Sequence, residues 1–322
     1  MTETTAVARY RGALPQLDSA AFLTDGGIET TLIFHDGLEL PYFAAYDLLT
    51  REGGEEALVR YFEPYIRIAR EQGVGIVLET ATWRANPDWA ERIGHAPAQL
   101  DDLNRRAVAL VERLRDEHET PTTPIVISGC IGPRGDGYVV GETMSADEAA
   151  AYHGVQIGTF ADTAADLVTA ITMTYADEAV GVVDTARAAG LSVVVSFTVE
   201  TDGRLPSGQT LGEAIEEVDA RTEGAAAYFM INCAHPSHFY DVLEPGSAWT
   251  ERIRGLRANA SRLSHAELDE AEELDEGDPE ELANEYVALR ERLPGLTVLG
   301  GCCGTDHRHM DAISNAWLAA SD

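Results

Sequence analysis

The stretch LVTAITMTYADEAVGVVDTARAAGLSVVVSF, Leu167 to Phe197, contains one complete unit of strand, helix and strand. Its two ends, Leu167 to Ile171 and Ser192 to Phe197, are short runs rich in β-branched and apolar residues. The segment Ala176 to Ala189 between them has helical composition. Continuous apolar strands that alternate with helices are typical of a parallel sheet buried on both faces, so the stretch predicts an α/β fold.

The same alternation extends over the rest of the chain. Eight short apolar runs follow one another, with segments of helical period or composition between them. The predicted strands are Ala21 to Asp25, Gly75 to Glu79, Pro124 to Gly129, Leu167 to Ile171, Ser192 to Phe197, Ala227 to Asn232, Ile253 to Ala258 and Leu296 to Gly300. Because eight parallel strands close a barrel, we predict a single-domain (β/α)₈ TIM barrel over residues 1–322.

An open doubly wound sheet is the alternative arrangement of such units. The first predicted strand runs into Asp25-Gly26-Gly27-Ile28, which lacks the full Gly-x-Gly-x-x-Gly pattern of a dinucleotide-binding loop. The chain also has no Walker loop for phosphates. These two absences favour the barrel.

Two segments interrupt the regular alternation. Thr31 to Pro64 is longer than one loop and one helix, so we expect it to form an extension over one end of the barrel. Ser264 to Glu285 contains ELDEAEELDEGDPEEL, and we expect this acidic run to be the helix after the seventh strand, with a solvated outer face.

The net charge of the chain excludes some classes of binding partner. The 55 acidic residues outnumber the 23 basic ones, all of them arginine, and the formal net charge is −32. Such a surface repels the backbone of nucleic acids and anionic lipid headgroups, so we expect neither nucleic acid nor a membrane as partner. Met1 to Leu17 contains no apolar run like that of a signal peptide, and we expect a cytoplasmic protein. No sequence feature specifies an oligomeric state.

The cysteines carry the strongest chemical signal. Cys233 follows one predicted strand, and Cys302 and Cys303 follow another within Gly300-Gly301-Cys302-Cys303-Gly304. In a parallel barrel the carboxyl ends of all strands meet at one face, so the three thiols are expected to converge there. Three thiolates suit Zn²⁺ and leave a fourth tetrahedral position open for substrate, as in a catalytic rather than a structural site. We expect Cys130, near the end of the third strand, to be a packing residue.

These residues belong to a set of short motifs that resembles a known family. The motifs are DGGIET at Asp25 to Thr30, TATW at Thr80 to Trp83, GCIGPRG at Gly129 to Gly135, SFT at Ser196 to Thr198, INC at Ile231 to Cys233 and GGCCGT at Gly300 to Thr305. In this order they resemble the landmarks of the zinc-dependent homocysteine S-methyltransferase family. The resemblance spans nearly the whole chain, and it implies a (β/α)₈ barrel with Cys233, Cys302 and Cys303 as zinc ligands. It also implies that Asp25 and Gly26 hold the amino-acid part of the thiol substrate, and His309 matches a family histidine shortly after GGCCG.

This chain departs from the family's pattern at the end of the fourth predicted strand. The family usually has Glu-Thr there and a second Glu seven residues on, whereas this chain has Ile171-Thr172 and then Glu178. The acid that grips the substrate ammonium is therefore missing, and a buried ammonium without an anion is costly. Glu79, just before TATW, and Glu29, where the family's first motif has glycine, are the candidates to supply that charge.

The expected chemistry is the transfer of a methyl group from a donor with a good leaving group to homocysteine, which forms methionine. The donor would be a sulfonium, such as S-methylmethionine or S-adenosylmethionine, or a quaternary ammonium such as betaine. Trp83, Tyr138 and Phe197 could offer aromatic faces to such a cation. Two alternatives remain open: a methyltransferase for a thiol or selenol without the homocysteine amine, motivated by Ile171, and a non-catalytic zinc or redox protein.

Overall fold

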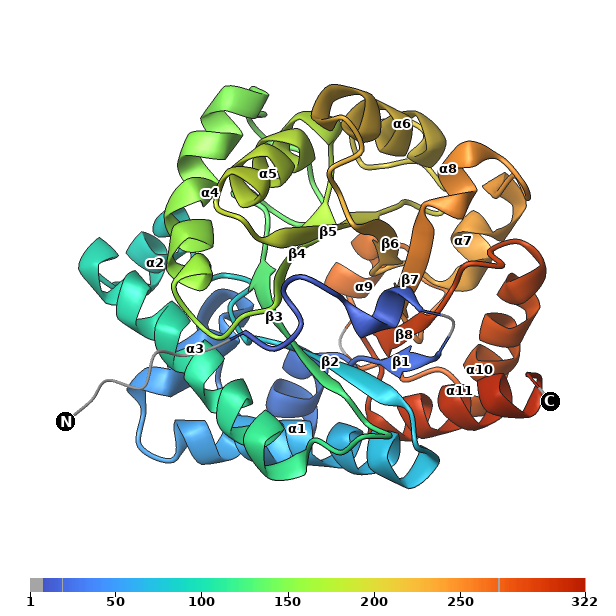
Figure 1. The fold of residues 1–322 in the computed structure, drawn as a ribbon, viewed down its shortest axis with the longest axis horizontal. Coiled ribbons are helices and arrows are strands. Elements are labelled where there is room, and N and C mark those ends of the chain that lie inside the picture. Colours follow the sequence, from blue (N-terminus) through green and yellow to red (C-terminus); the bar gives the residue numbers. More distant parts are fainter. Residues whose placement is uncertain (1–7, 19, 272, 322) are drawn as a thin grey trace.

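The computed structural model describes residues 8–18, 20–271 and 273–321, and its strands form a closed, all-parallel, eight-stranded barrel (Figure 1). The barrel strands are β1 (Phe22–Leu23), β2 (Gly75–Glu79), β3 (Ile125–Ile131), β4 (Leu167–Met173), β5 (Ser192–Thr198), β6 (Tyr228–Asn232), β7 (Ile253–Ala258) and β8 (Val298–Gly301). Each strand pairs with the next in sequence, and β1 also pairs with β8. The predicted TIM barrel is thus confirmed, and the open sheet is wrong.

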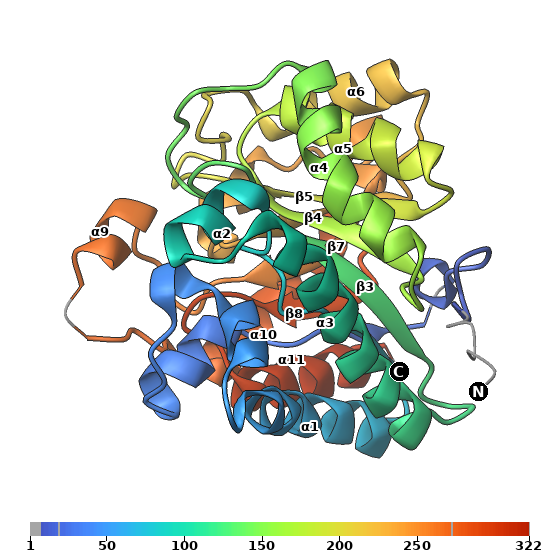
Figure 2. The same ribbon diagram turned by 90° about the vertical axis from the view of Figure 1, so that its left-hand side faces the viewer.

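Helices surround the barrel and cover the outer faces of its strands (Figures 1 and 2). They are α1 (Gly54–Gln72), α2 (Pro87–Ile93), α3 (Pro97–His118), α4 (Ala146–Ala161), α5 (Ala176–Ala188), α6 (Leu211–Thr222), α7 (Pro236–Phe239), α8 (Ala248–Glu251), α9 (His265–Asp269), α10 (Pro279–Ala288) and α11 (His307–Ala319). Short 3₁₀ or π turns occupy Pro15–Leu17, Thr30–His35, Pro41–Phe43, Ala45–Thr50, Tyr240–Val242 and Leu289–Glu291.

The inside of the barrel is divided into an apolar and a polar half. At the amino end of the strands, side chains such as Phe22, Val126, Val194 and Val298 pack into one buried cluster. Towards the carboxyl end the barrel also buries polar or charged side chains, which include Asp25, Glu79, Ser128, Thr169, Ser196, Asn232 and Arg257. Burying polar groups is costly unless they are paired, so this half of the barrel is built for a ligand rather than for stability alone.

The two irregular segments differ in part from expectation. Thr31 to Gly53 does form short turns outside the regular alternation, and its Ala45 lines the cavity at the carboxyl end of the strands, but Gly54 to Pro64 belongs to α1. The single acidic helix predicted over Ser264 to Glu285 is wrong. The segment contains α9 and the first part of α10, because Pro279 holds Asp278 extended and the Asp278 carboxylate caps a new helix at the backbone N–H groups of Glu280 and Glu281.

None of the helices in the described part of the chain is both long and apolar enough to cross a membrane.

Candidate metal centre and substrate pocket

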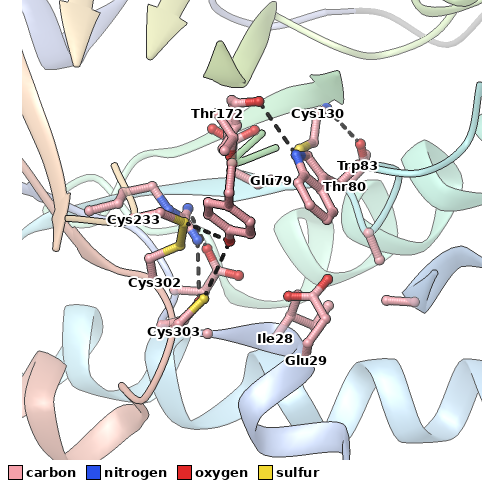
Figure 3. A pocket seen from close by; sticks show the side chains of 18 residues that line it. Ile28, Glu29, Glu79, Thr80, Trp83, Cys130, Thr172, Cys233, Cys302 and Cys303 are labelled. Carbon is pink, nitrogen blue, oxygen red and sulfur yellow. Dashed lines mark hydrogen bonds and ion pairs between the residues drawn. A yellow bond between two sulfur atoms is a disulfide. The ribbon is translucent and has the colours of Figure 1, made fainter. Parts of the chain in front are cut away.

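A cavity opens where the carboxyl ends of the barrel strands meet (Figure 3). Its place at this end of the strands is the usual place of the active site in a (β/α)₈ barrel. The cavity is lined by every residue that the sequence assigned to the site, namely Asp25, Gly26, Glu29, Glu79, Ile171, Cys233, Cys302 and Cys303. The barrel brings them together because each follows the end of a strand or lies in its last residues.

The three cysteine sulfur atoms lie together on one wall of the cavity. The Sγ atoms of Cys233, Cys302 and Cys303 are all within 4.8 Å of one another. Thiolates at about 2.3 Å from a tetrahedral Zn²⁺ would be about 3.8 Å apart, so the three residues fit such an ion. In the structure the sulfurs of Cys233 and Cys302 form a disulfide, and Cys303 is free and exposed. All three can act as ligands only in the reduced protein.

Cys233 is held in a left-handed backbone conformation that a non-glycine residue rarely adopts. Its φ is 53°, and its carbonyl oxygen accepts hydrogen bonds from Asn259 Nδ2 at 3.0 Å and from the ring of His265. Asn232, the residue before it, bonds the hydroxyl groups of Ser196 and Thr172. These contacts from β4, β5 and the segment after β7 aim the Cys233 side chain at the other two cysteines.

Tyr138, in the loop after β3, reaches across the cavity to the cysteines. Its hydroxyl donates to Cys233 Sγ at 3.5 Å and lies 3.6 Å from Cys303 Sγ. The ring of His265 packs against the Tyr138 ring with centroids 4.5 Å apart. Tyr138 is the one proposed aromatic residue that touches the sulfur cluster.

Arg257 is a site residue that the sequence analysis missed. It lies at the end of β7 with 6% of its surface exposed, and its Nη1 atom is 2.7 Å from Asp25 Oδ1. Asp25 Oδ2 also accepts the hydroxyl of Tyr61 at 2.7 Å. Although burial disfavours its charge, the carboxylates of Asp25 and Glu79 hold the pKa of Arg257 above its ordinary value. The charge of Asp25 is therefore already matched inside the protein.

Glu79 is the deeper of the two remaining carboxylates. Only 5% of its surface is exposed, and its Oε2 atom has no hydrogen-bond partner among the residues that the structure describes. Burial raises the pKa of Glu79 to about 7, although Arg257 and the hydroxyl groups of Ser128 and Thr169 favour its ionised form. This oxygen is available to a cationic ligand.

The raised pKa of Glu79 predicts a pH-dependent effect on stability. In the unfolded chain the group titrates near 4.5 and in the folded protein near 7, so ionisation opposes folding increasingly between these two pH values and fully above them. Glu79→Gln is expected to match the wild type in free energy of unfolding at pH 4 and to exceed it by about 3 kcal/mol at pH 8. Denaturant titrations of the metal-free proteins would measure this, and an equal difference at both pH values would contradict it.

Three of the residues named in the sequence analysis lie away from the ligand cavity. Phe197 is fully buried against Phe229, so its proposed role in binding a cation is wrong. His309 bonds the backbone carbonyl of Glu276 and the carboxylate of Asp306 instead of facing the cavity. Glu178 is paired with His153, so it does not replace the missing acid.

The remaining predictions concern residues that do line the cavity. Ile171 does so from β4 with 8% of its surface exposed, at the position where the family resemblance implies an acid. Cys130 is buried and also lines it, apart from the three-sulfur cluster. Trp83 lines the cavity too, but the guanidinium of Arg84 already covers its ring at 3.8 Å from the centroid. That face is closed to a cationic ligand.

Comparison with known proteins agrees with the barrel fold. The model of the family described as homocysteine S-methyltransferase matches residues 22–317. No curated protein sequence matches the chain. The chain belongs to the homocysteine S-methyltransferase family, and it is a methyltransferase.

Solved structures of similar fold include the homocysteine methyltransferase MmuM from Escherichia coli. Its metallated form is 18% identical to this chain with a TM-score of 0.72, covering 93% of this chain and 97% of MmuM. Its oxidized form is 19% identical with the same TM-score of 0.72, covering 96% and 98% of the two chains. At this identity the likeness concerns the fold.

Proposed function

We propose that this enzyme transfers a methyl group from a sulfonium or quaternary-ammonium donor to the sulfur of homocysteine, which forms methionine. The observation that carries the proposal is the convergence of the Cys233, Cys302 and Cys303 sulfurs in the ligand cavity of the barrel. An acceptor thiol bound in this cavity would have its sulfur beside the three cysteine sulfurs and the metal that they would bind.

The metal proposed for this cluster is Zn²⁺, with the three cysteines as its ligands. Soft thiolates prefer Zn²⁺ to hard cations such as Mg²⁺ or Ca²⁺, and the existence of a metallated form of MmuM supports a metal in this fold. When bound, Zn²⁺ would lower the pKa of the acceptor thiol, so that the nucleophilic thiolate is present at neutral pH. Asn259 and His265 would keep Cys233 in place for this role.

The protein's other residues would bind the amino-acid part of the acceptor. We assign the ammonium group to Glu79, whose free oxygen is buried in the pocket, because Asp25 is already paired with Arg257. The amine-binding acid would thus come from β2 instead of β4. Arg257 also lines the cavity, and because a guanidinium has five N–H donors, it would pair with the substrate carboxylate as well as with Asp25.

The second candidate is methyl transfer to a thiol or selenol that lacks the amine. Ile171 favours it, since an apolar side chain lines the cavity where an acid is expected. Because the chain belongs to a methyltransferase family, a non-catalytic zinc or redox protein is no longer proposed.

A panel of thiols decides between the two candidates. Reduced, zinc-loaded protein would be given S-methylmethionine and either homocysteine or mercaptobutyrate, which is homocysteine without its amine. We expect kcat/KM to be higher for homocysteine by about tenfold or more, because only this substrate pairs with Glu79. Equal or better use of mercaptobutyrate would favour the second candidate.

A further inference from the structure

Glu29 is a carboxylate of the pocket that has no role in the proposed binding of the acceptor. It lines the cavity together with Asp25 and Glu79, but Asp25 is paired with Arg257 and Glu79 lies at the buried floor. Glu29 is only partly buried, and it makes no hydrogen bond or ion pair with any other residue that the structure describes. An unpaired carboxylate at the mouth of a pocket is suited to a cationic ligand.

The loop that carries Glu29 is fastened to the loop that carries two of the cysteines. Gly301 N donates to Asp25 O at 2.9 Å, Gly27 N donates to Thr305 O at 3.0 Å, and Gly304 N donates to Thr30 Oγ1 at 3.0 Å. The contact is so close that a Cβ on Gly27 would come within 2.6 Å of Cys302 O. Glu29 is therefore held at a fixed position relative to Cys303.

Figure 3 shows where this position lies. The Glu29 side chain points into the cavity from beside Cys303, and Trp83 lies on the opposite side. Burial, together with the smaller effect of the Asp25 carboxylate, raises the pKa of Glu29 to about 7, although the nearby Arg84 and Arg257 favour its ionised form. Neither arginine forms an ion pair with Glu29, so the carboxylate remains open to a ligand.

We propose that Glu29 recognises the positive charge of the methyl donor. This inference rests on the proposed function: an acceptor held by the cysteines and by Glu79 fills the floor, and the donor then enters past Glu29. A donor methyl group near Cys303 would have its onium centre on the Glu29 side of the pocket. Glu29 is thus a specificity residue for cationic donors.

The chemistry of the transfer predicts which kinetic constant Glu29 controls. The acceptor reacts as a thiolate, whose proton has been released to solvent. Its sulfur forms a bond to the methyl carbon, the bond between that carbon and the onium centre breaks, and its electron pair stays on the leaving sulfur or nitrogen. The donor is cationic before the reaction and uncharged at that centre afterwards. A carboxylate beside it therefore stabilises the bound donor more than the transition state, which lowers KM for the donor without raising kcat.

The test compares a cationic with an uncharged donor. The protein is loaded with zinc and saturated with homocysteine, and kcat/KM is measured for trimethylsulfonium and for methyl iodide. Glu29→Gln is expected to lower the ratio of the first value to the second by about tenfold, mainly because KM for the sulfonium rises. Glu29→Asp, which keeps the charge, should recover part of the ratio. Glu63→Gln, an exposed and unpaired glutamate on α1, is the matched control.

A binding measurement separates this inference from the proposed function. Tetramethylammonium, an unreactive cation of similar size, should bind the wild type about ten times more tightly than Glu29→Gln in calorimetric titrations, whether or not the protein turns over. Equal binding to both proteins, or an equal loss of activity with both donors, would overturn the inference. It would also be overturned if Glu29→Gln raised KM for homocysteine but not for mercaptobutyrate, because Glu29 would then bind the acceptor amine.

Discussion

Replacing Cys233, Cys302 or Cys303 by alanine is expected to remove the metal and to lower methyl transfer by a factor on the order of a thousand. With one sulfur missing, two thiolates remain, too few for a stable zinc site, and the acceptor loses the ion that would activate it. Atomic absorption of the reduced proteins should give about one zinc per chain for the wild type and little for each variant.

The barrel should stay folded in these variants. The core is built by the strands and helices, and a catalytic ion at the mouth of a barrel does not hold it together. Circular dichroism and thermal melting would confirm this, and Cys130→Ala, which lies outside the sulfur cluster, should keep its zinc. If all three alanine variants retained zinc, the assignment of the ligands would be wrong.

The second large effect is expected from Glu79→Gln. If this carboxylate pairs with the acceptor ammonium, its loss leaves a charge unpaired in a buried site, and KM for homocysteine should rise by about a hundredfold. The change for mercaptobutyrate should be within a few fold, since this thiol has no ammonium to lose its partner. Steady-state kinetics with both thiols and a single donor would measure the difference.

Ile171→Glu provides the complementary test. It places an acid at the position where the family resemblance implies one, so it should improve homocysteine use by Glu79→Gln. Equal KM changes for both thiols in Glu79→Gln, together with no gain from Ile171→Glu, would show that the amine is recognised elsewhere. Asp25→Asn is a poorer probe, because it also leaves the buried Arg257 without its partner.

Much of this architecture was predictable because it depends on local pattern. Strands buried on both faces, such as Ser192 to Phe197, appear as continuous apolar runs, and helices between them force a parallel order. Once the barrel is assumed, strand ends meet at one face, so the convergence of Cys233 with Cys302 and Cys303 follows from topology despite their separation in sequence.

The strand and helix patterns do not predict the direction of the Arg257 side chain or the break within the acidic segment. Alternation places Arg254 and Arg257 on opposite faces of β7, but it does not say which of them points into the barrel, where Asp25 matches its charge. The break between α9 and α10 was predictable, because Asp278-Pro279 is a typical helix start. The acidic residues on both sides of it led to the prediction of one continuous helix.

Methyl transfer with and without metal tests whether the cysteine cluster and its metal activate a thiol for methylation. Reduced protein would be incubated with S-methylmethionine and with homocysteine deuterated in its carbon chain, so that only methionine formed from the acceptor carries the label. The labelled methionine would be detected by mass spectrometry. Labelled methionine is expected to form, to disappear when a chelator removes the metal and to return when Zn²⁺ is added back. The proposed function would be contradicted if zinc-loaded, reduced protein formed no methylated product from any of the proposed donors and thiols, or if product formation were unaffected by removal of the metal.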